Sequence, residues 1–252
     1  MYMERIGEER DGGLNIDEIR EYGLKADFDG IDIVQARTFA NRIDVDAQLE
    51  NHRDILVRKT ALMIPDLSGK NSLDIGTGEG RWARFMMSKG SAKVVGIDTS
   101  HGMIEIAKER TPIDSSASYV IDDVAGFEGV EFDFANAFFV TNYVQELVPF
   151  FRRVSRALTS GGEFIFTVKA IELGEDDKKV FDSYLLPISG KNGSTIFSYP
   201  HSQVDYLGAI EKAGFELIGS FSRTTDDIFV NERLNSLSYE INDLIGLCKN
   251  RE

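Results

Sequence analysis

Cysteine is almost absent from this chain, and long apolar runs are absent altogether. The 252 residues include one cysteine, Cys248, so no disulfide can form within the chain and no zinc site can be built from several cysteines. No stretch of about 18 apolar residues occurs, so no transmembrane helix is expected. The first residues also lack the apolar core of a secretory signal peptide. These absences predict a cytoplasmic protein without a membrane partner.

Positive charge is scarce as well. Lysine and arginine total 28 against 42 aspartates and glutamates, which gives a net charge of −14. Such a surface repels phosphate backbones and anionic membranes and favours neutral or cationic ligands. We therefore expect no nucleic-acid partner. The 42% of hydrophobic residues is ordinary for a folded protein and allows a sizeable core.

The hydrophobic pattern divides the chain into two predicted parts. Residues 1–66 are polar and acidic with apolar residues at helical spacing, and they are expected to form a helical cap or lid that ends at Pro65. Residues 67–252 are expected to form the main domain. A charged, glycine-containing segment at about 170–200 is longer than an ordinary connection, so it is either an insertion over the site or a mobile loop.

From Ser72 onward, short apolar runs alternate with helical patterns, the order that builds parallel strands joined by helical crossovers. The predicted strands are Ser72–Ile75, Val94–Ile97, Tyr119–Ile121, Phe132–Phe138, Glu163–Val168, Phe215–Ser222 and Leu244–Cys248. The predicted helices are Arg81–Ser88, Met103–Glu109, Val148–Leu158, closed by Ser160-Gly161-Gly162, and Ser202–Ala213. The pattern predicts an α/β fold: a seven-stranded, mostly parallel sheet with helices on both faces and an antiparallel strand at its C-terminal edge.

A glycine-rich loop, Leu73-Asp74-Ile75-Gly76-Thr77-Gly78-Glu79-Gly80, lies where a predicted strand ends and a helix begins. Open α/β sheets bind nucleotide-like ligands at this place, and glycines let backbone amides approach them. Dinucleotide sites use Gly-x-Gly-x-x-Gly and hold a pyrophosphate. Here Glu79 lies inside the loop and Asp74 precedes it, and these carboxylates suit a cationic ligand without phosphates. A glycine-rich turn without a ligand is the alternative.

Acidic residues also end the next two predicted strands. Asp98 ends the second, where an acid can accept hydrogen bonds from both ribose hydroxyls. Asp122 and Asp123 end the third, where one carboxylate can accept from an adenine amino group and the Val124 amide can donate to a ring nitrogen. Acids at three successive strand ends beside the glycine loop favour a nucleoside site over solvated strand termini.

Taken in order, these segments resemble the class I S-adenosylmethionine-dependent methyltransferases, particularly those acting on small molecules. The matching stretches are Leu73–Gly80, Val95–Ser100 with Met103 and Ala107, Val120–Val124, Phe132 through Tyr143, and Arg156–Phe164, with a weaker match at Ala213–Leu217. The resemblance implies a Rossmann-like fold, S-adenosylmethionine as cofactor and S-adenosylhomocysteine as product. It implies methyl transfer by in-line displacement to an oxygen or nitrogen of a small organic acceptor, such as a secondary metabolite. A regulatory or partner protein that keeps the fold but has no acceptor chemistry is the alternative.

The resemblance also implies which residues hold the cofactor. The methionine part would be held by the loop residues Asp74, Gly76, Thr77, Gly78 and Gly80, with Asp74 near the ammonium group. Asp98 would bind the ribose, and Thr99 and Met103 would border the nucleoside. Asp123 and Val124 would bind adenine, with Asp122 as the neighbouring choice. The backbone at Ala137 and Phe138 would close the methionine end, and Asn142 and Tyr143 would face the methyl group or the acceptor.

Groups that could accept a proton are few. Many relatives carry histidine where this chain has Asn142, so a base at that position is absent. His201, which precedes the last predicted helix, and Tyr143 are the candidates if the acceptor is a hydroxyl; a neutral amine needs no base. His52 and His101 are interpreted as solvated or capping residues.

A metal site is not predicted. The end of the fourth predicted strand and the residues just after it, Asn136–Thr141, offer no acid to bind a divalent ion, whereas metal-dependent relatives carry acids there. The residues before 66 and the segment 170–200 are expected to form an apolar acceptor cavity and its lid. The sequence leaves a monomer and a homodimer open.

Overall fold

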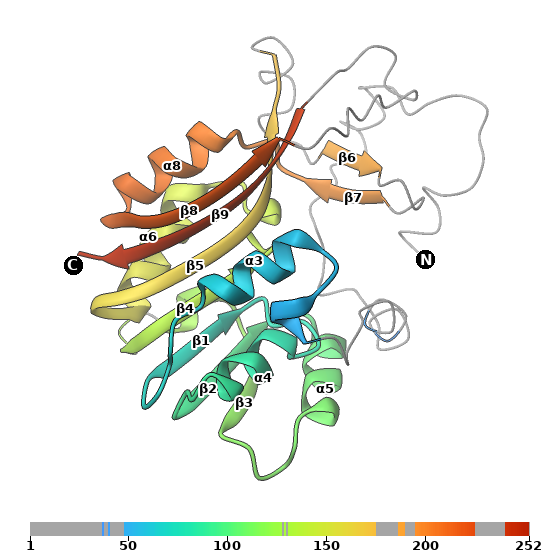
Figure 1. The fold of residues 1–252 in the computed structure, drawn as a ribbon, viewed down its shortest axis with the longest axis vertical. Coiled ribbons are helices and arrows are strands. Elements are labelled where there is room, and N and C mark those ends of the chain that lie inside the picture. The colour runs from blue at the N-terminus through green and yellow to red at the C-terminus, as the bar shows by residue number, and fades with distance from the viewer. Residues whose placement is uncertain are drawn as a thin grey trace.

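The computed structural model describes residues 37, 40, 48–127, 129, 131–174, 186–189, 195–224 and 240–251. The expectation of a helical cap before residue 48 lies almost entirely outside these residues, as does the central part of the expected insertion, 175–185 and 190–194. The sheet, its helices and the glycine loop lie within them (Figure 1).

A seven-stranded sheet forms the centre of the structure (Figure 1). Its strands in sequence order are β1 (Asn71–Ile75), β2 (Lys93–Asp98), β3 (Ala117–Ile121), β4 (Phe132–Phe138), β5 (Leu158–Glu172), β8 (Phe215–Thr224) and β9 (Glu240–Asn250). Their order across the sheet is β3-β2-β1-β4-β5-β9-β8. The five strands β1 to β5 are parallel, and β9 pairs antiparallel with both β5 and β8. The predicted seven-stranded, mostly parallel sheet is confirmed.

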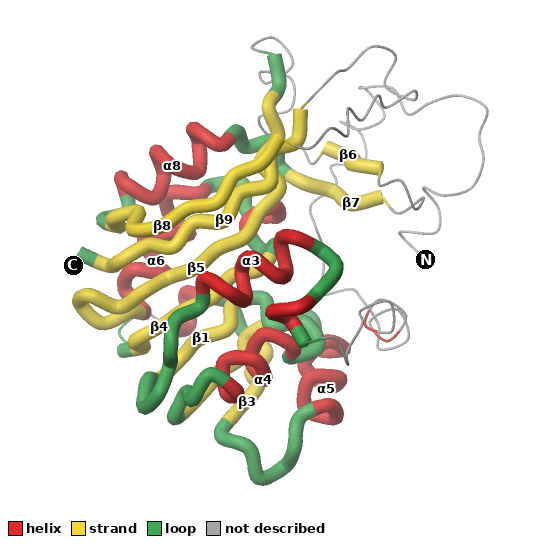
Figure 2. The backbone as a smooth tube through the Cα atoms, in the orientation of Figure 1, coloured by secondary structure: helices red, strands yellow, loops and turns green. Residues whose placement is uncertain are grey.

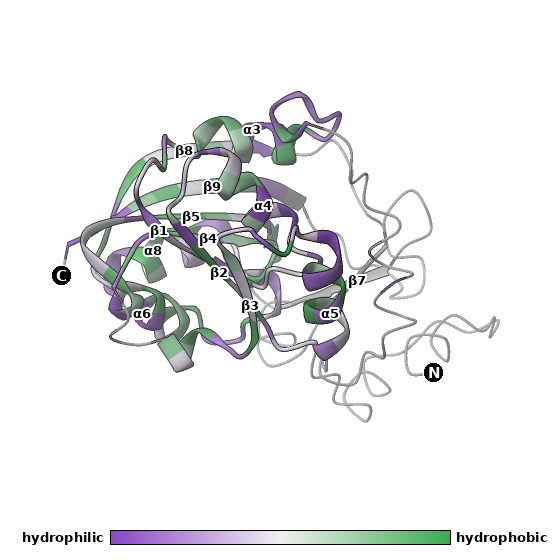
Figure 3. Cartoon of the chain, turned by 90° about the horizontal axis from the view of Figure 1, so that it is seen from below, coloured by the Kyte–Doolittle hydropathy of each residue, from purple (hydrophilic) through white to green (hydrophobic). Residues whose placement is uncertain are grey.

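Helices cover both faces of this sheet, as the sequence predicts. One face carries α3 (Ile55–Met63), α4 (Arg81–Ser88) and α5 (His101–Arg110), and the other carries α6 (Leu147–Ala157) and α8 (Gln203–Lys212). Figure 2 shows α3 and α4 in front of the strands and α6 and α8 behind them. In Figure 3, purple and green alternate along α5 and α6, as expected for helices that bury one face.

Local signals explain where these helices begin. Asp54 caps α3, with its Oδ1 accepting from the Leu56 amide at 2.8 Å. The Ser100 hydroxyl accepts from the Met103 amide at the start of α5. Ser202 and Asp205 form a reciprocal capping box on α8. Because α4 follows the glycine loop directly, its N-cap is Gly80 at a φ of 83°.

Several boundaries differ from the sequence prediction. The residues Ser160-Gly161-Gly162 lie inside β5 and do not close a helix; α6 ends earlier, at Ala157, and Leu158 already pairs with Phe132. The predicted antiparallel pairing at the C-terminal edge is confirmed, with β8 as the edge strand and β9 one place in from it. Part of the expected insertion is regular: β5 continues to Glu172, and β6 (Leu186–Ser189) and β7 (Thr195–Ser198) form a separate two-stranded sheet.

The helix α3 belongs to the layer that covers the sheet. The predicted division assigns it to the cap, yet Leu56, Val57 and Ala61 are buried in the same cluster as Phe134 and Ile245 of the sheet. The buried hydroxyls of Thr60 and Thr167 also lie 2.7 Å apart, which joins α3 to β5. Residues 55–63 therefore pack as part of the main domain.

Cys248 is expected to be unreactive in the folded protein. It is fully buried on β9, and burial raises the pKa of its thiol to about 12. Compared with the ordinary value of 9.0, this lowers the thiolate fraction about a thousandfold at neutral pH. Ellman's reagent should therefore label the protein only after denaturation, and rapid labelling of the native protein would contradict the burial of β9.

Candidate active site

The glycine loop is held in one conformation by its own backbone. Thr77 donates to the carbonyl of Ile97 on β2 at 2.8 Å, and Gly80 donates to the carbonyl of Thr77 at 2.9 Å. The φ values of Gly76, Gly78 and Gly80 are 64°, 54° and 83°, all in the left-handed region that favours glycine. The loop therefore needs glycine at these positions.

The surroundings of the three glycines differ. A Cβ atom on Gly76 would collide with the side chain of Val140, and one on Gly80 would lie 2.7 Å from the Tyr119 hydroxyl. A Cβ atom on Gly78 would have no described atom within 4 Å of it. The open space that a ligand could use is therefore at Gly78, and the two outer glycines are required by packing.

Asp98 is joined directly to this open part of the loop. Its Oδ2 accepts from the Gly78 amide at 2.9 Å, and its Oδ1 accepts from the Ser100 amide at 2.9 Å. The carboxylate is half-buried at the end of β2, the position at which an acid can accept hydrogen bonds from ribose hydroxyls. The structure thus brings together the predicted methionine-binding loop and the predicted ribose-binding acid.

The predicted adenine-binding residues follow at the end of β3. Asp122 donates its amide to the Asp98 carbonyl at 3.2 Å, so the two strand ends lie side by side. Asp122 is half-buried and Asp123 is exposed, with its Oδ1 accepting from the Ala125 amide at 2.5 Å. Val124 is buried at the start of a short 3-10 helix, Val124–Phe127.

The residues expected to border the nucleoside lie at the start of α5. Thr99 is exposed, whereas Met103 is 8% exposed and packs with Ile106 and Ala40. Ala40 is one of the few N-terminal residues that the structure describes. Ala40 itself therefore lies against α5, on the predicted nucleoside side of the site.

Asp74 is deeply buried, and its oxygens face protein donors. Thr77 Oγ1 donates to Oδ2 at 2.6 Å, and Asn136 Nδ2 donates to Oδ1 at 2.9 Å. Burial raises the pKa of the Asp74 carboxyl to about 6, and the hydrogen bonds from Thr77 and Asn136 oppose this rise. Through these contacts the Asp74 carboxylate holds the glycine loop and β4 together. Its predicted contact with the ammonium of the cofactor stays a prediction.

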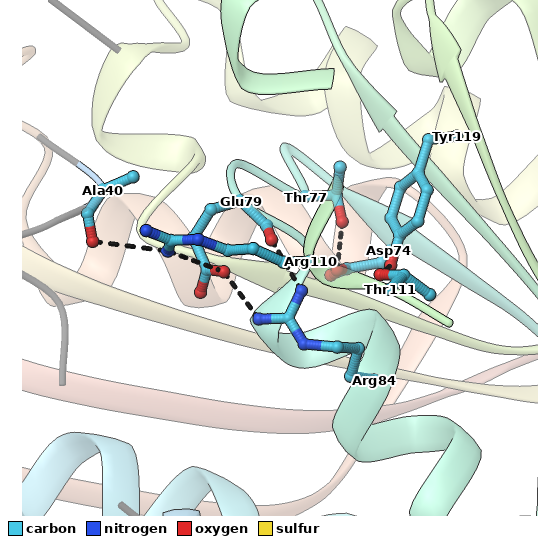
Figure 4. Close-up of polar contacts among 8 residues, drawn as sticks. All are labelled: Ala40, Asp74, Thr77, Glu79, Arg84, Arg110, Thr111 and Tyr119. Carbon is cyan, nitrogen blue, oxygen red and sulfur yellow. Dashed lines mark hydrogen bonds and ion pairs between the residues drawn. The ribbon is translucent and has the colours of Figure 1, made fainter. Parts of the chain in front are cut away.

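Two arginines bind Glu79 of the glycine loop (Figure 4). Neither of them is predicted from the sequence as part of the site. Arg84 of α4 donates to the Glu79 carboxylate at 2.6 Å and to the Glu79 carbonyl at 2.7 Å. Arg110, at the end of α5, donates to the same carboxylate at 3.2 Å and to the Ala40 carbonyl at 3.4 Å. Glu79 is 2% exposed, so its charge is neutralised inside the protein. The carboxylate expected to favour a cationic ligand is therefore used by the protein.

The segment after β4 covers the loop from the other side. Ala137 is buried within β4, and Phe138 packs on Trp82 of α4 at 4.8 Å between ring centroids. Phe139 adopts a φ of 59°, which is rare for a residue other than glycine, and its amide donates to the Thr167 carbonyl at 2.8 Å. Val140 then contacts Gly76. The predicted closure of the methionine end is consistent with this aromatic cover.

The predicted catalytic side lies around a 3-10 helix, Thr141–Tyr143. Asn142 is buried, and its Nδ2 donates to the Lys169 carbonyl at 3.1 Å. The backbone carbonyl of Asn142 accepts from the Tyr199 amide at 2.8 Å. Burial raises the pKa of Tyr143 to about 12, so its phenol keeps its proton at neutral pH. Tyr143 is therefore better suited to donate a hydrogen bond than to act as a base.

His201 lies beside this helix, half-buried. Its Nε2 is 2.7 Å from the Val144 carbonyl oxygen, which can only accept, so Nε2 carries a proton. The ring also packs edge-on against Tyr206 of α8. A cavity of about 400 Å³ between α6 and α8 is lined by His201, among others, on the face of the sheet opposite α4. A role as proton acceptor would have to use Nδ1 and stays a prediction.

Two features are absent from the described ranges. No helix there is long and apolar enough to cross a membrane. No group of three or more histidine, cysteine, aspartate or glutamate side chains is arranged to hold a metal ion in the described part of the chain. Metal independence stays a prediction.

The described residues fit S-adenosylmethionine better than a dinucleotide. The open space at Gly78 lies beside Asp98, and Asp74 is a buried acid under the same loop. Asp98 suits a ribose, and the negative charge of Asp74 under the loop favours a positively charged group over a pyrophosphate. The residues that would hold the group are the loop 76–80, Asp98 and the 122–124 segment.

Comparison with known proteins agrees with this geometry. Residues 73–166 match the family model described as a methyltransferase domain. Residues 73–166 are therefore similar to methyltransferase domains, and the chain has the fold of S-adenosylmethionine-dependent methyltransferases. The matched range includes the glycine loop and the strand-end acids, and this supports S-adenosylmethionine as the cofactor.

Individual relatives match over part of their length. Phosphoethanolamine N-methyltransferase 2 of Caenorhabditis elegans is 34% identical over 121 residues, which cover 46% of this chain and 28% of the relative. Trans-aconitate 2-methyltransferase of Afipia carboxidovorans is 32% identical over 119 residues, 46% of this chain and 44% of the relative. The chain thus matches less than half the length of these curated relatives. An S-adenosylmethionine-dependent methyltransferase from Mesorhizobium loti has the same fold, with a TM-score of 0.55 at 18% identity over 82% of this chain and all of that one.

Proposed function

We propose that this protein transfers a methyl group from S-adenosylmethionine to an oxygen or nitrogen of a small organic acceptor, without a metal ion. The observation that carries the proposal is the bond between Gly78 and Asp98, which places an open, glycine-lined space next to an acid that can accept from ribose hydroxyls. When bound, the cofactor supplies a methyl group on a positively charged sulfur, which is already activated for displacement. The protein's own task is then alignment and exclusion of water.

Particular residues suit these tasks. The Gly76–Gly80 loop and Asp98 bind the cofactor, and Asp122, Asp123 and Val124 border the adenine. Trp82 and Phe138 form an aromatic cover that excludes water from the methionine end. Asn142 and Tyr143 face the acceptor, with Tyr143 as a hydrogen-bond donor. If the acceptor is a hydroxyl, Nδ1 of His201 is the proposed proton acceptor.

The acceptor is proposed to be small and not strongly anionic. Two relatives are named for small molecules, phosphoethanolamine and trans-aconitate, and this supports a small-molecule acceptor here. The net charge of −14 favours a neutral or cationic acceptor over an anionic one such as nucleic acid. The N-terminal residues and the 170–200 segment are proposed to enclose it, with the protein acting in the cytoplasm as a monomer or homodimer.

Calorimetry tests the first half of this proposal. S-adenosylhomocysteine should bind, and NAD should not, because the charge of Asp74 under the loop disfavours a pyrophosphate. Turnover is then sought with isotopically labelled methyl donor and a panel of amines and hydroxyl compounds, with chelator in every reaction. Equal binding of NAD would refute the cofactor assignment. Activity that appears only after magnesium is added would refute metal independence.

A further inference from the structure

Asn136 is a polar side chain in the middle of a buried strand. It is 0% exposed on β4, and its neighbours Ala135 and Ala137 are buried too. Its Nδ2 donates to Asp74 Oδ1 at 2.9 Å, and because a carboxylate only accepts, this contact fixes the orientation of the amide. Its Oδ1 has no hydrogen-bond partner among the residues that the structure describes. A buried amide oxygen without a hydrogen-bond partner lowers the stability of the fold, so the presence of Asn136 here requires a reason.

The reason lies in what Asp74 holds together. Its carboxylate accepts from the Thr77 hydroxyl in the glycine loop, from the backbone amide of Ala83 in α4, and from Asn136 on the neighbouring strand. Asp74 and Asn136 are register partners across β1 and β4, so their side chains lie on the same face of the sheet. The carboxylate thus connects the loop, the first turn of α4 and β4.

We propose that Asn136 is a positioning residue of the cofactor site, which acts through Asp74: its amide keeps the buried carboxylate charged and directed at the glycine loop, so that the loop is set for the cofactor. The inference rests on the proposed function and extends it to a residue outside the glycine loop and the strand-end acids.

Protonation of Asp74 is the step that Asn136 opposes. The pKa of this carboxyl is raised to about 6, chiefly by burial and in smaller part by the charge of Asp98, while the amide of Asn136 lowers it. A protonated carboxyl has no charge and one acceptor oxygen fewer for its three donors. The negative charge that attracts an ammonium group is then lost, so affinity for a cofactor with such a group should fall as the pH drops through about 6.

Other charged groups lie around this carboxyl, and their effects on binding must be distinguished from its own. Asp98 faces it from β2, Tyr119 from β3, and the Glu79–Arg84 pair lies at the loop and α4. His52 contacts Arg81 in the first turn of α4. These groups are shared by all the variants below. The control His52→Gln removes the one imidazole that lies close to α4 in the described structure.

The test compares wild type, Asn136→Leu, Asp74→Asn and the double variant by calorimetry with S-adenosylhomocysteine from about pH 5 to about pH 8. Wild-type affinity should fall at low pH with a midpoint near the pKa of Asp74. Asn136→Leu should move this midpoint upward by about one pH unit, because a hydrogen bond to the charged form is lost. In the Asp74→Asn background, Asn136→Leu should not alter the pH dependence of the affinity. His52→Gln should keep the wild-type midpoint.

Two results would overturn the inference. One is a loss of affinity in Asn136→Leu by the same factor at every pH. The other is an unchanged effect of Asn136→Leu when Asp74 is already asparagine. If the leucine variant does not fold, Asn136→Asp keeps the side-chain size and replaces the donor by an acid. Asn136→Asp should raise the pH midpoint of the affinity further than Asn136→Leu does.

Unfolding without ligand separates this inference from the proposed function. The folded pKa of Asp74 lies above its ordinary value of 3.8, so its contribution to stability is fully present below about pH 4 and is lost as the pH rises through about 6. The difference in unfolding free energy between wild type and Asp74→Asn should show this pH dependence. In the Asn136→Leu background, the curve of this difference against pH should extend to higher pH. If wild type binds no S-adenosylhomocysteine at any pH, the proposed function fails, while an unshifted curve in the Asn136→Leu background refutes the link between Asn136 and Asp74.

Discussion

Alanine at Gly80 is expected to destabilise the fold strongly, whereas alanine at Gly78 is expected to spare the fold and weaken the cofactor. Gly80 has a φ of 83°, and an added Cβ would lie 2.7 Å from the Tyr119 hydroxyl and 2.9 Å from Arg84 Nη1. Left-handed strain and overpacking together should cost about 2–4 kcal/mol, which lowers the melting temperature by roughly 5–15 °C. Thermal unfolding without ligand measures this effect.

Gly78→Ala is the matched control on the same loop. Its φ is 54°, but no described atom lies within 4 Å of the new methyl group, so only the backbone strain of about 1 kcal/mol applies. The methyl group would occupy the open space beside Asp98, and affinity for S-adenosylhomocysteine should fall at least about tenfold. If both alanine variants lose the same stability and the same affinity, the distinction between packing and ligand glycines is wrong.

Replacing Asp98 with alanine should cost about 1–3 kcal/mol of affinity for S-adenosylhomocysteine, roughly tenfold to a hundredfold. Two effects act in the same direction. The ribose hydroxyls lose a charged acceptor, and the amides of Gly78 and Ser100 lose the partner that holds the loop beside β2. Calorimetry measures the affinity, with melting temperatures as a check on folding.

Two further variants separate these effects. Asp98→Asn keeps one acceptor oxygen and should lose less than the alanine variant. Lys93→Ala changes an exposed side chain at the opposite end of the same strand and should bind almost as wild type does. Unchanged affinity in Asp98→Ala would mean that Asp98 only terminates its strand.

The extent of agreement between sequence and structure depends on how local each signal is. The helix Arg81–Ser88 and the strand Phe132–Phe138 match their predicted bounds, because a glycine turn and a buried apolar run specify them within a few residues. The position of β9 between β5 and β8 cannot be predicted in the same way. Alternating apolar residues indicate that a strand forms, but they do not say which strands it pairs with.

The same holds for the site. The order of motifs around Gly78 and Asp98 is specific enough to predict that both belong to one site, and the structure joins them by a hydrogen bond. Sequence reasoning misses Asn136, Arg84 and Arg110 as parts of it. Their partners, Asp74 and Glu79, become neighbours only through strand register and helix packing. Asn136 does give one signal, since it is the polar residue at a position where the buried strand pattern favours an apolar one.

The position of β9 also has a consequence for how the chain is made. On a ribosome, β5 emerges long before residues 240–250, and until those residues appear it has an unpaired edge that is rich in apolar side chains. The edge strand β8 has no partner at that time either, because it pairs with β9 and not with β5. The last part of the sheet is therefore assembled only after residues 240–250 have been synthesised, and nascent chains that stop short of them carry a surface that favours aggregation or binding by chaperones.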